Sequence, residues 1–297
     1  MGNKTLRYFL AFAAIYLIWG TTYLAIVIGL RTIPPFLMAS MRFAIAAILL
    51  IGYSLLKGEG IPSLASLTKN AIIGTTVLAG GQGLLIWSEQ HIASGYASVL
   101  VATLPVWFIV YDRSNWTYYR QKPSILIGVA LGFTGIGVLF WEQLNESDDN
   151  TSHLQILASI LVLVGAMCWV AGTLYNRSKP AVGSIYKNLG WQLAFGCISC
   201  LIISLVLGES FTSLSSASLE SLLAVVYLAV AGSIIAYVAY TWLLSEFPSA
   251  IVSTYAYINP VVAVFLGWLL AEERISTQQI GGMIIILTSA ILINRNR

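Results

Sequence analysis

The sequence predicts an all-α, polytopic membrane protein with ten transmembrane helices in a 5+5 inverted repeat. Of its 297 residues, 58% are hydrophobic and only 9% are charged, whereas a soluble domain carries about 25% charged residues. A chain of this composition cannot cover a surface that faces water, so the lipid bilayer is its expected surrounding. We expect no cleavable signal peptide, because the first apolar run is too long and no small-residue cleavage site ends it.

Ten apolar stretches are long enough to cross a bilayer as helices, which takes about 20 mainly apolar residues. Their length favours helices over barrel strands, whose polar and apolar residues alternate over about 10 positions. The longest connections, 57–70, 112–123, 142–153 and 208–218, are expected to be loops, with no soluble domain. The predicted spans are approximately 8–28, 36–56, 71–90, 94–111, 124–141, 154–175, 187–207, 219–245, 249–270 and 277–294.

The positions of Lys and Arg predict the orientation, because cytoplasmic loops carry an excess of these residues. With ten helices and a cytoplasmic N-terminus, 12 of the 15 basic residues fall on the cytoplasmic side. We therefore expect both termini in the cytoplasm and the protein in the inner or plasma membrane. The twelve are Lys4, Arg7, Lys57, Lys69, Arg113, Arg120, Lys122, Arg177, Lys179, Lys187, Arg295 and Arg297.

An internal repeat divides the chain into two predicted units, 1–147 and 148–297. The stretch from Trp87 to Pro105 returns as Trp242 to Pro260, and the shift also matches Ser94 with Ser249 and Ser98 with Ser253. Because each unit has five helices, an odd number, the second must be inverted in the membrane. Inverted repeats are typical of secondary transporters, whose binding site lies near the midplane between the repeats.

Pro105 and Pro260 are candidate hinges, because they fall at mirrored depths inside the fourth and ninth apolar stretches. Proline removes a backbone N–H and frees a carbonyl one turn earlier. A kink that serves packing alone is the competing interpretation.

Gln82 lies in a glycine-rich run in the third stretch, and its repeat mate is Tyr237. A buried amide without partners costs roughly 2–7 kcal/mol, so we expect both side chains to line a central cavity. The alternative for the glycines is a small-residue packing face between helices.

Arg42 is the basic residue that lies well inside an apolar run, and its repeat mate is Gln192. Arg42 could extend outward to the membrane surface. Alternatively, it faces the cavity and pairs with an anionic group, such as a substrate carboxylate or Glu89.

Deep aromatic residues could form the apolar wall of a binding site for a moderately hydrophobic or cationic solute. Packing in the core is the competing interpretation for each of them. These candidates are Trp19, Tyr23, Trp169, Tyr237, Tyr255 and Tyr257.

Enzyme, metal and nucleic-acid functions find little support in the sequence. Cys168, Cys197 and Cys200 lie in apolar runs and are interpreted as packing residues, and no metal-binding or ATP-binding motif is present. The small net charge of +3 without a basic block argues against nucleic acid. Asp112 is interpreted as a solvated partner of Arg113. We expect no metal or cofactor.

The chain resembles the drug/metabolite transporter superfamily, EamA type. The resemblance rests on Trp19-Gly20, Arg42, the Ala/Ser-rich starts of the fourth and ninth stretches, and Pro105 and Pro260. Glu272-Glu273 before Gly281-Gly282 fits as well, whereas the equivalent acid in the first half is displaced to Asp112. The resemblance implies a carrier of small metabolites, often an amino-acid or drug exporter, with a cavity between the halves.

Together these observations predict a secondary transporter, working as a monomer or weak homodimer, that exports a small organic solute by alternating access. A non-transporting receptor or scaffold is the alternative, followed by an intramembrane enzyme.

Overall fold

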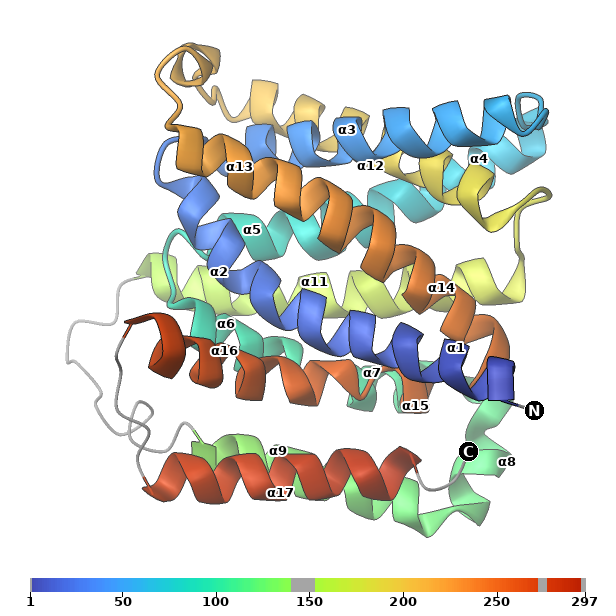
Figure 1. Ribbon diagram of the computed structural model, residues 1–297, viewed down its shortest axis with the longest axis vertical. Helices are drawn as coiled ribbons and strands as arrows, with labels where there is room; N and C mark the ends of the chain where they lie inside the picture. The colour runs from blue at the N-terminus through green and yellow to red at the C-terminus, as the bar shows by residue number, and fades with distance from the viewer. Residues whose placement is uncertain (1, 140–152, 272–276, 295–297) are drawn as a thin grey trace.

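In the computed structural model the chain is a bundle of helices lying side by side (Figure 1), and the structure describes residues 2–139, 153–271 and 277–294. No strand occurs within those ranges. The helix pair α3 (Pro35–Leu56) and α12 (Ile185–Val206) lies at one end of the bundle. The pair α9 (Pro123–Leu139) and α17 (Thr277–Asn294) lies at the other end.

The first half of the chain contains α1 (Gly2–Ala13), η1 (Ala14–Ile18), α2 (Trp19–Leu30), α3, α4 (Leu64–Ile73), η2 (Gly74–Gly83), α5 (Leu84–Ser88), α6 (Ser94–Val101), α7 (Leu104–Tyr111), η3 (Arg113–Asn115), α8 (Trp116–Gln121) and α9. The second half contains α11 (His153–Ser178), α12, η4 (Phe211–Leu214), α13 (Leu219–Tyr227), η5 (Leu228–Ala236), α14 (Tyr237–Glu246), α15 (Ser249–Val252), α16 (Tyr255–Ala271) and α17. The segments η1, η2 and η5 are π-helical, and η3 and η4 are 3₁₀ turns.

Seven helices in the described chain are long and apolar enough to cross a membrane, or eight if one bent pair counts as a single span. They confirm an all-helical, polytopic membrane protein. The predicted spans 249–270 and 277–294 fall on α15 with α16 and on α17. The seven helices are Lys4–Leu30, Pro35–Leu56, Leu64–Ser88, Ser94–Tyr111, His153–Ser178, Ile185–Val206 and Leu219–Glu246.

The expectation of a loop over 112–123 is wrong. The segment forms η3 and α8, and the helical axis then bends by 97° into α9. Aromatic and polar residues are mixed over Trp116–Gln121, so this segment carries no apolar run that would reveal a helix.

Both helices that contain the candidate hinge prolines are interrupted before the proline. Residues 102–103 separate α6 from α7, and residues 253–254 separate α15 from α16. At each break a threonine hydroxyl donates to a carbonyl of the preceding turn, Thr103 to Leu100 and Thr254 to Ile251, both at 2.7 Å. These bonds satisfy carbonyls that cannot bond to water in lipid.

The two prolines occupy different places relative to these breaks. Pro105 lies in the first turn of α7, where its missing N–H has no helical partner to lose. Pro260 lies inside α16, several residues beyond its break.

Glu209 and Glu59 connect the two halves at opposite ends of the α3–α12 pair. Glu209, which follows α12, accepts from the backbone N–H groups of Phe36 and Leu37 at 3.1 and 2.8 Å, at the start of α3. Glu59, which follows α3, accepts from the N–H of Ser184 at 3.1 Å, at the start of α12. Each half therefore supplies an acidic cap to a helix of the other.

A left-handed glycine precedes each of these glutamates. Gly58 has φ 79° and Gly208 has φ 70°, a conformation that glycine adopts without steric cost at a helix C-terminus. The glycine turns the chain back, so the following glutamate reaches the neighbouring helix.

The first testable prediction concerns Glu209. The N-cap of α3 is Pro34, whose side chain makes no capping bond, so Glu209→Ala leaves two helix N–H groups without an acceptor. We expect a loss of about 1–2 kcal/mol in the free energy of unfolding. Thermal unfolding in detergent measures it. Glu220→Ala is the control, because its pair with Arg31 is exposed. An unchanged melting temperature in Glu209→Ala would contradict the capping role.

Candidate functional site

A small cavity lies in the middle of the bundle, between helices from both halves of the chain. Its volume is about 40 Å³, enough for a few water molecules, each of which needs at least about 10–15 Å³. The lining combines aromatic rings, small residues and a few polar side chains. It consists of Trp19, Thr22, Tyr23, Gly81, Gln82, Leu85, Val101, Leu104, Val162, Gly165, Ala166, Trp169, Tyr255 and Asn259.

Five of the side chains predicted from the sequence line this cavity together, namely Trp19, Tyr23, Gln82, Trp169 and Tyr255. Thr22 and Asn259 line it as well and were not predicted. Asn259 directly precedes Pro260, and a polar amide inside an apolar stretch is the signal that could have identified it.

Arg42 is buried beside this cavity, with 2% of its surface exposed. Its Nε donates to Ser233 Oγ at 2.7 Å, and its Nη1 donates to Gln82 Oε1 at 3.2 Å. The outward orientation of Arg42 is therefore wrong. Arg42 joins Gln82 of the first half to Ser233 of the second half, and in doing so it satisfies the partly buried amide oxygen of Gln82.

The backbone around Gly232 is shaped for these contacts. A Cβ at Gly232 would lie 2.9 Å from Arg42 Nη2, so a larger residue would displace the guanidinium. The carbonyl of Gly232 accepts from Trp19 Nε1 at 3.1 Å, and Ser233 Oγ donates to the carbonyl of Leu228 at 3.1 Å. These residues belong to the π-helical segment η5, whose wider turn redirects backbone groups.

The glycine-rich run in η2 serves packing as well as the cavity. A Cβ at Gly81 would lie 3.1 Å from the Trp169 ring, and one at Gly165 would lie 3.0 Å from the Gly81 carbonyl. The absence of side chains lets η2 and α11 approach closely, and the same approach brings Gln82 to the cavity.

Tyr240, which the sequence did not single out, packs behind the cavity wall against the rings of Trp19 and Trp169. Its hydroxyl accepts from Trp169 Nε1 at 3.0 Å and shares a 3.2 Å hydrogen bond with Thr173. Trp19 packs against Trp169 and Tyr255 with ring centroids 5.6 and 4.5 Å apart. Tyr240 lies one helical turn after Tyr237, and this spacing was the available signal.

A second cavity, of about 560 Å³, lies between α11, α12 and α14. Thr173 and Gln192 belong to its lining. Because Thr173 and the cavity residue Trp169 share the hydroxyl of Tyr240, this tyrosine lies between the second cavity and the central one.

Gln192 and Tyr237 lie outside the central cavity. Gln192 accepts from the Tyr237 hydroxyl at 3.0 Å and donates to Asn70 Oδ1 at 3.3 Å. The pair fixes α14 against α12 and connects both to the first half through Asn70.

Tyr257 also lies elsewhere. Its hydroxyl donates to the Val129 carbonyl of α9 at 3.4 Å, and its ring packs against Phe133. It belongs to the contact between α16 and α9.

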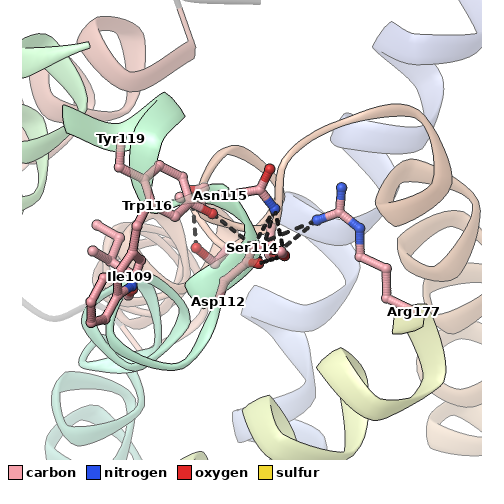
Figure 2. A network of polar contacts seen from close by, with 10 residues as sticks. Ile109, Asp112, Ser114, Asn115, Trp116, Tyr119 and Arg177 are labelled. Atoms are coloured by element: carbon pink, nitrogen blue, oxygen red, sulfur yellow. Dashed lines mark hydrogen bonds and ion pairs between the residues drawn. The ribbon is translucent and has the colours of Figure 1, made fainter. Parts of the chain in front are cut away.

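A polar network surrounds Asp112 on the side of the bundle where α1 begins and α17 ends (Figures 1 and 2). The Asp112 carboxylate is 3% exposed and forms an ion pair with Arg177 at 3.7 Å. It accepts hydrogen bonds from Ser249 at 2.7 Å and Tyr119 at 2.9 Å. The interpretation of Asp112 as a solvated partner of Arg113 is therefore wrong.

This network joins segments from both halves, because Asp112 follows α7 whereas Arg177 and Ser249 belong to α11 and α15. Burial raises the pKa of the Asp112 carboxyl, but the hydrogen bonds outweigh it and hold the pKa below its usual value. Those bonds come from Ser249, Ser114, Asn115 and Tyr119.

Within the described ranges, no three His, Cys, Asp or Glu side chains gather in a way that could hold a metal ion. The arrangement is a polytopic helical bundle with a central aromatic and polar cavity, a structure suited to passing a solute.

The chain belongs to the EamA-like transporter family, whose model matches residues 6–141 and again 156–295. The match confirms the resemblance to EamA-type permeases of the drug/metabolite transporter superfamily, so this protein is a membrane transporter by family.

Curated relatives match along nearly the whole chain. The uncharacterized inner membrane transporter YedA of Escherichia coli is 38% identical, over 98% of this chain and 92% of YedA. A probable amino-acid metabolite efflux pump of the same organism is 26% identical, over 92% of this chain and 90% of the pump. A known crystal structure matches with a TM-score of 0.76 over 98% of both chains at 19% identity, which shows the fold.

The second testable prediction concerns Asp112. Because folding lowers its pKa from about 3.9, the carboxylate stabilises the fold above that pH, and this contribution is lost as the pH falls through the folded-state pKa. Asp112→Asn should lower the free energy of unfolding by about 1–3 kcal/mol at pH 7. The difference should shrink below about pH 4.

Thermal unfolding of both proteins across this pH range measures the effect, with Glu220→Gln as an exposed control. A difference between wild type and Asp112→Asn that stays constant with pH would show that the carboxylate is not the stabilising group.

Proposed function

We propose that this protein is a secondary transporter that moves a small organic solute, outward, by alternating access between two inverted halves. The central cavity, lined by residues from both halves, carries this proposal. A solute bound there contacts both halves at once, so a movement of one half against the other can change the side on which the site opens.

The size of the cavity indicates that this conformation is closed around it. Pockets that hold drug-sized ligands have volumes of about 300–1,000 Å³, whereas the central cavity has about 40 Å³. Loading a solute therefore requires its walls to separate. The cavity of about 560 Å³ next to Tyr240 offers an approach from the side where α1 begins.

The ten-helix, 5+5 arrangement is part of this proposal. It is supported by the two matches of the family model and by the reciprocal caps at Glu59 and Glu209. The helix breaks before Pro105 and Pro260 are suitable hinges, because turns with i→i−3 backbone hydrogen bonds replace the regular helix there.

The names of two relatives support the direction of transport and the membrane that we propose. One relative is named a probable amino-acid metabolite efflux pump and another an inner membrane transporter. We propose export across the inner membrane, with both termini in the cytoplasm. In the site, Gln82 and Arg42 provide polar contacts, and Trp19, Trp169 and Tyr255 provide the apolar wall.

The third testable prediction compares two variants in a metabolite-wide uptake and resistance screen of overproducing cells. Gln82→Ala removes an amide from the cavity wall and also removes a hydrogen-bond acceptor of Arg42. A hydrogen bond to a charged group is worth about a factor of 10 or more in binding, so we expect transport to fall at least about 10-fold. Tyr257→Phe is the matched control, since it removes one buried hydrogen bond outside the cavity.

The result that supports the site is a solute whose transport falls in Gln82→Ala and is kept in Tyr257→Phe at equal membrane abundance. If both variants lose transport equally, the cavity is not the solute site. If no solute responds to overproduction of the wild type, a receptor or scaffold becomes the better explanation.

A further inference from the structure

Three buried side-chain oxygens have no hydrogen-bond partner in the described part of the chain. They are both carboxylate oxygens of Glu89 and the Oδ1 atom of Asn259. Glu89 is 7% exposed and Asn259 is 2% exposed. In a lipid-embedded bundle such atoms are costly to leave unpaired, so their location indicates a function.

The two residues come from different halves of the chain and share one neighbour, Tyr23. Tyr23 interacts electrostatically with the Glu89 carboxyl, and the Tyr23 hydroxyl interacts with the Asn259 side chain. Tyr23 and Asn259 line the central cavity, as does Leu85. Glu89 lies one helical turn beyond Leu85, whose carbonyl accepts from its N–H at 3.1 Å. Asn259 therefore lies in the cavity wall, and Glu89 lies one helical turn beyond that wall.

The surroundings of Glu89 provide little to stabilise a negative charge. Arg42 acts on it through space, but the Arg42 guanidinium bonds to Ser233 and Gln82. The ion pairs in the described chain join other residues, so Glu89 has no salt bridge there. His91, two residues further on, packs against the Trp87 ring.

Protonation removes the cost of burying the Glu89 carboxylate without hydrogen-bond donors. Ionised, it needs hydrogen-bond donors, whereas the protonated acid carries its own donor and no net charge. Asn259 Oδ1 adds a further acceptor without a donor. Protonation of the Glu89 carboxyl would therefore supply the hydrogen-bond donor that this region lacks.

We propose that Glu89 is a proton-binding site, protonated in this closed conformation and deprotonated when water reaches it through the opened cavity. The O–H bond of the carboxyl breaks, its proton passes to a water molecule, and the electron pair stays on the carboxylate beside Arg42. The relation to opening rests on the transport function proposed above, and it would couple solute movement to a proton gradient.

The fourth testable prediction is spectroscopic and needs no solute. Infrared spectra of the purified protein at pH 7 should show the C=O band of a protonated carboxylic acid, and Glu89→Gln should lose it. Glu59→Gln is the matched control, because hydrogen bonds from Ser184 lower the pKa of the Glu59 carboxyl and keep it ionised. Glu89→Met, which also lacks a titrating group, should lose the same band. A band that is absent from the wild type, or unchanged in both Glu89 variants, would overturn the proposal.

Thermal unfolding provides a second readout. A buried acid that is neutral in the fold stabilises it at low pH, and this contribution is lost as the pH rises through its folded-state pKa. Glu89→Gln, which stays neutral, should therefore match the wild type at pH 4, below the unfolded-state pKa of about 4.3, and melt higher at pH 9.

If Glu89 is instead ionised and holds a cation, Glu89→Gln should melt lower at every pH, and sodium or ammonium chloride should raise the melting temperature of the wild type alone. That outcome refutes the proton site. Neither measurement involves transport, so a failure here is distinguishable from a failure of the transport proposal, which the Gln82→Ala screen decides.

Discussion

The buried guanidinium of Arg42 is the constraint on which the centre of the molecule depends. A charge in the core of a lipid-embedded bundle must find its partners within the protein, and Arg42 finds them on both halves, in Gln82 and Ser233. The guanidinium in this position is matched by a glycine at position 232 in the π-helical turn of η5, because a Cβ there would lie 2.9 Å from Arg42 Nη2. The same turn presents the carbonyl that Trp19 bonds. One charge therefore determines the place of an amide, a hydroxyl and an indole around the cavity.

The bundle around this centre is held by bonds that each half makes to the other. Glu209 caps α3 and Glu59 caps α12, and both glutamates follow a left-handed glycine. The two helix starts are not capped equally well. Helix α12 also has the side chain of Ser184 as an N-cap, whereas α3 begins after Pro34 and depends on Glu209 alone. The starts of α3 and α12 are therefore both capped by a glutamate of the other half, and only α12 has a second capping side chain.

The sequence predicted what depends on composition and spacing: the helical class, the approximate positions of seven spans and five of the cavity residues. It could not predict what depends on how the helices are rotated. Tyr257 and Tyr255 lie two residues apart in one apolar run, yet only Tyr255 faces the cavity. Asp112 resembled a surface acid because Arg113 is its neighbour in sequence, whereas its partners Arg177 and Ser249 come from helices far along the chain. The π-helical segments have no sequence signature of their own.

The Asp112 network makes the two halves of the bundle unequal, because one half lacks the matching residues. At the shifts that relate the halves, Ser249 corresponds to Ser94, Asp112 to Gly267 and Arg177 to Val27. At these matching positions the other half therefore has the serine but neither the acid nor the base. In an alternating-access cycle, two perfectly equivalent halves would make the inward-facing and outward-facing states equal in energy. Because this ion pair and its hydrogen bonds have no counterpart at the matching positions among the described residues, the proposed cycle favours the state that keeps Asp112, Arg177 and Ser249 together. A transporter with this imbalance rests in one conformation, and binding of the solute or a change in protonation must supply the difference before it opens on that side.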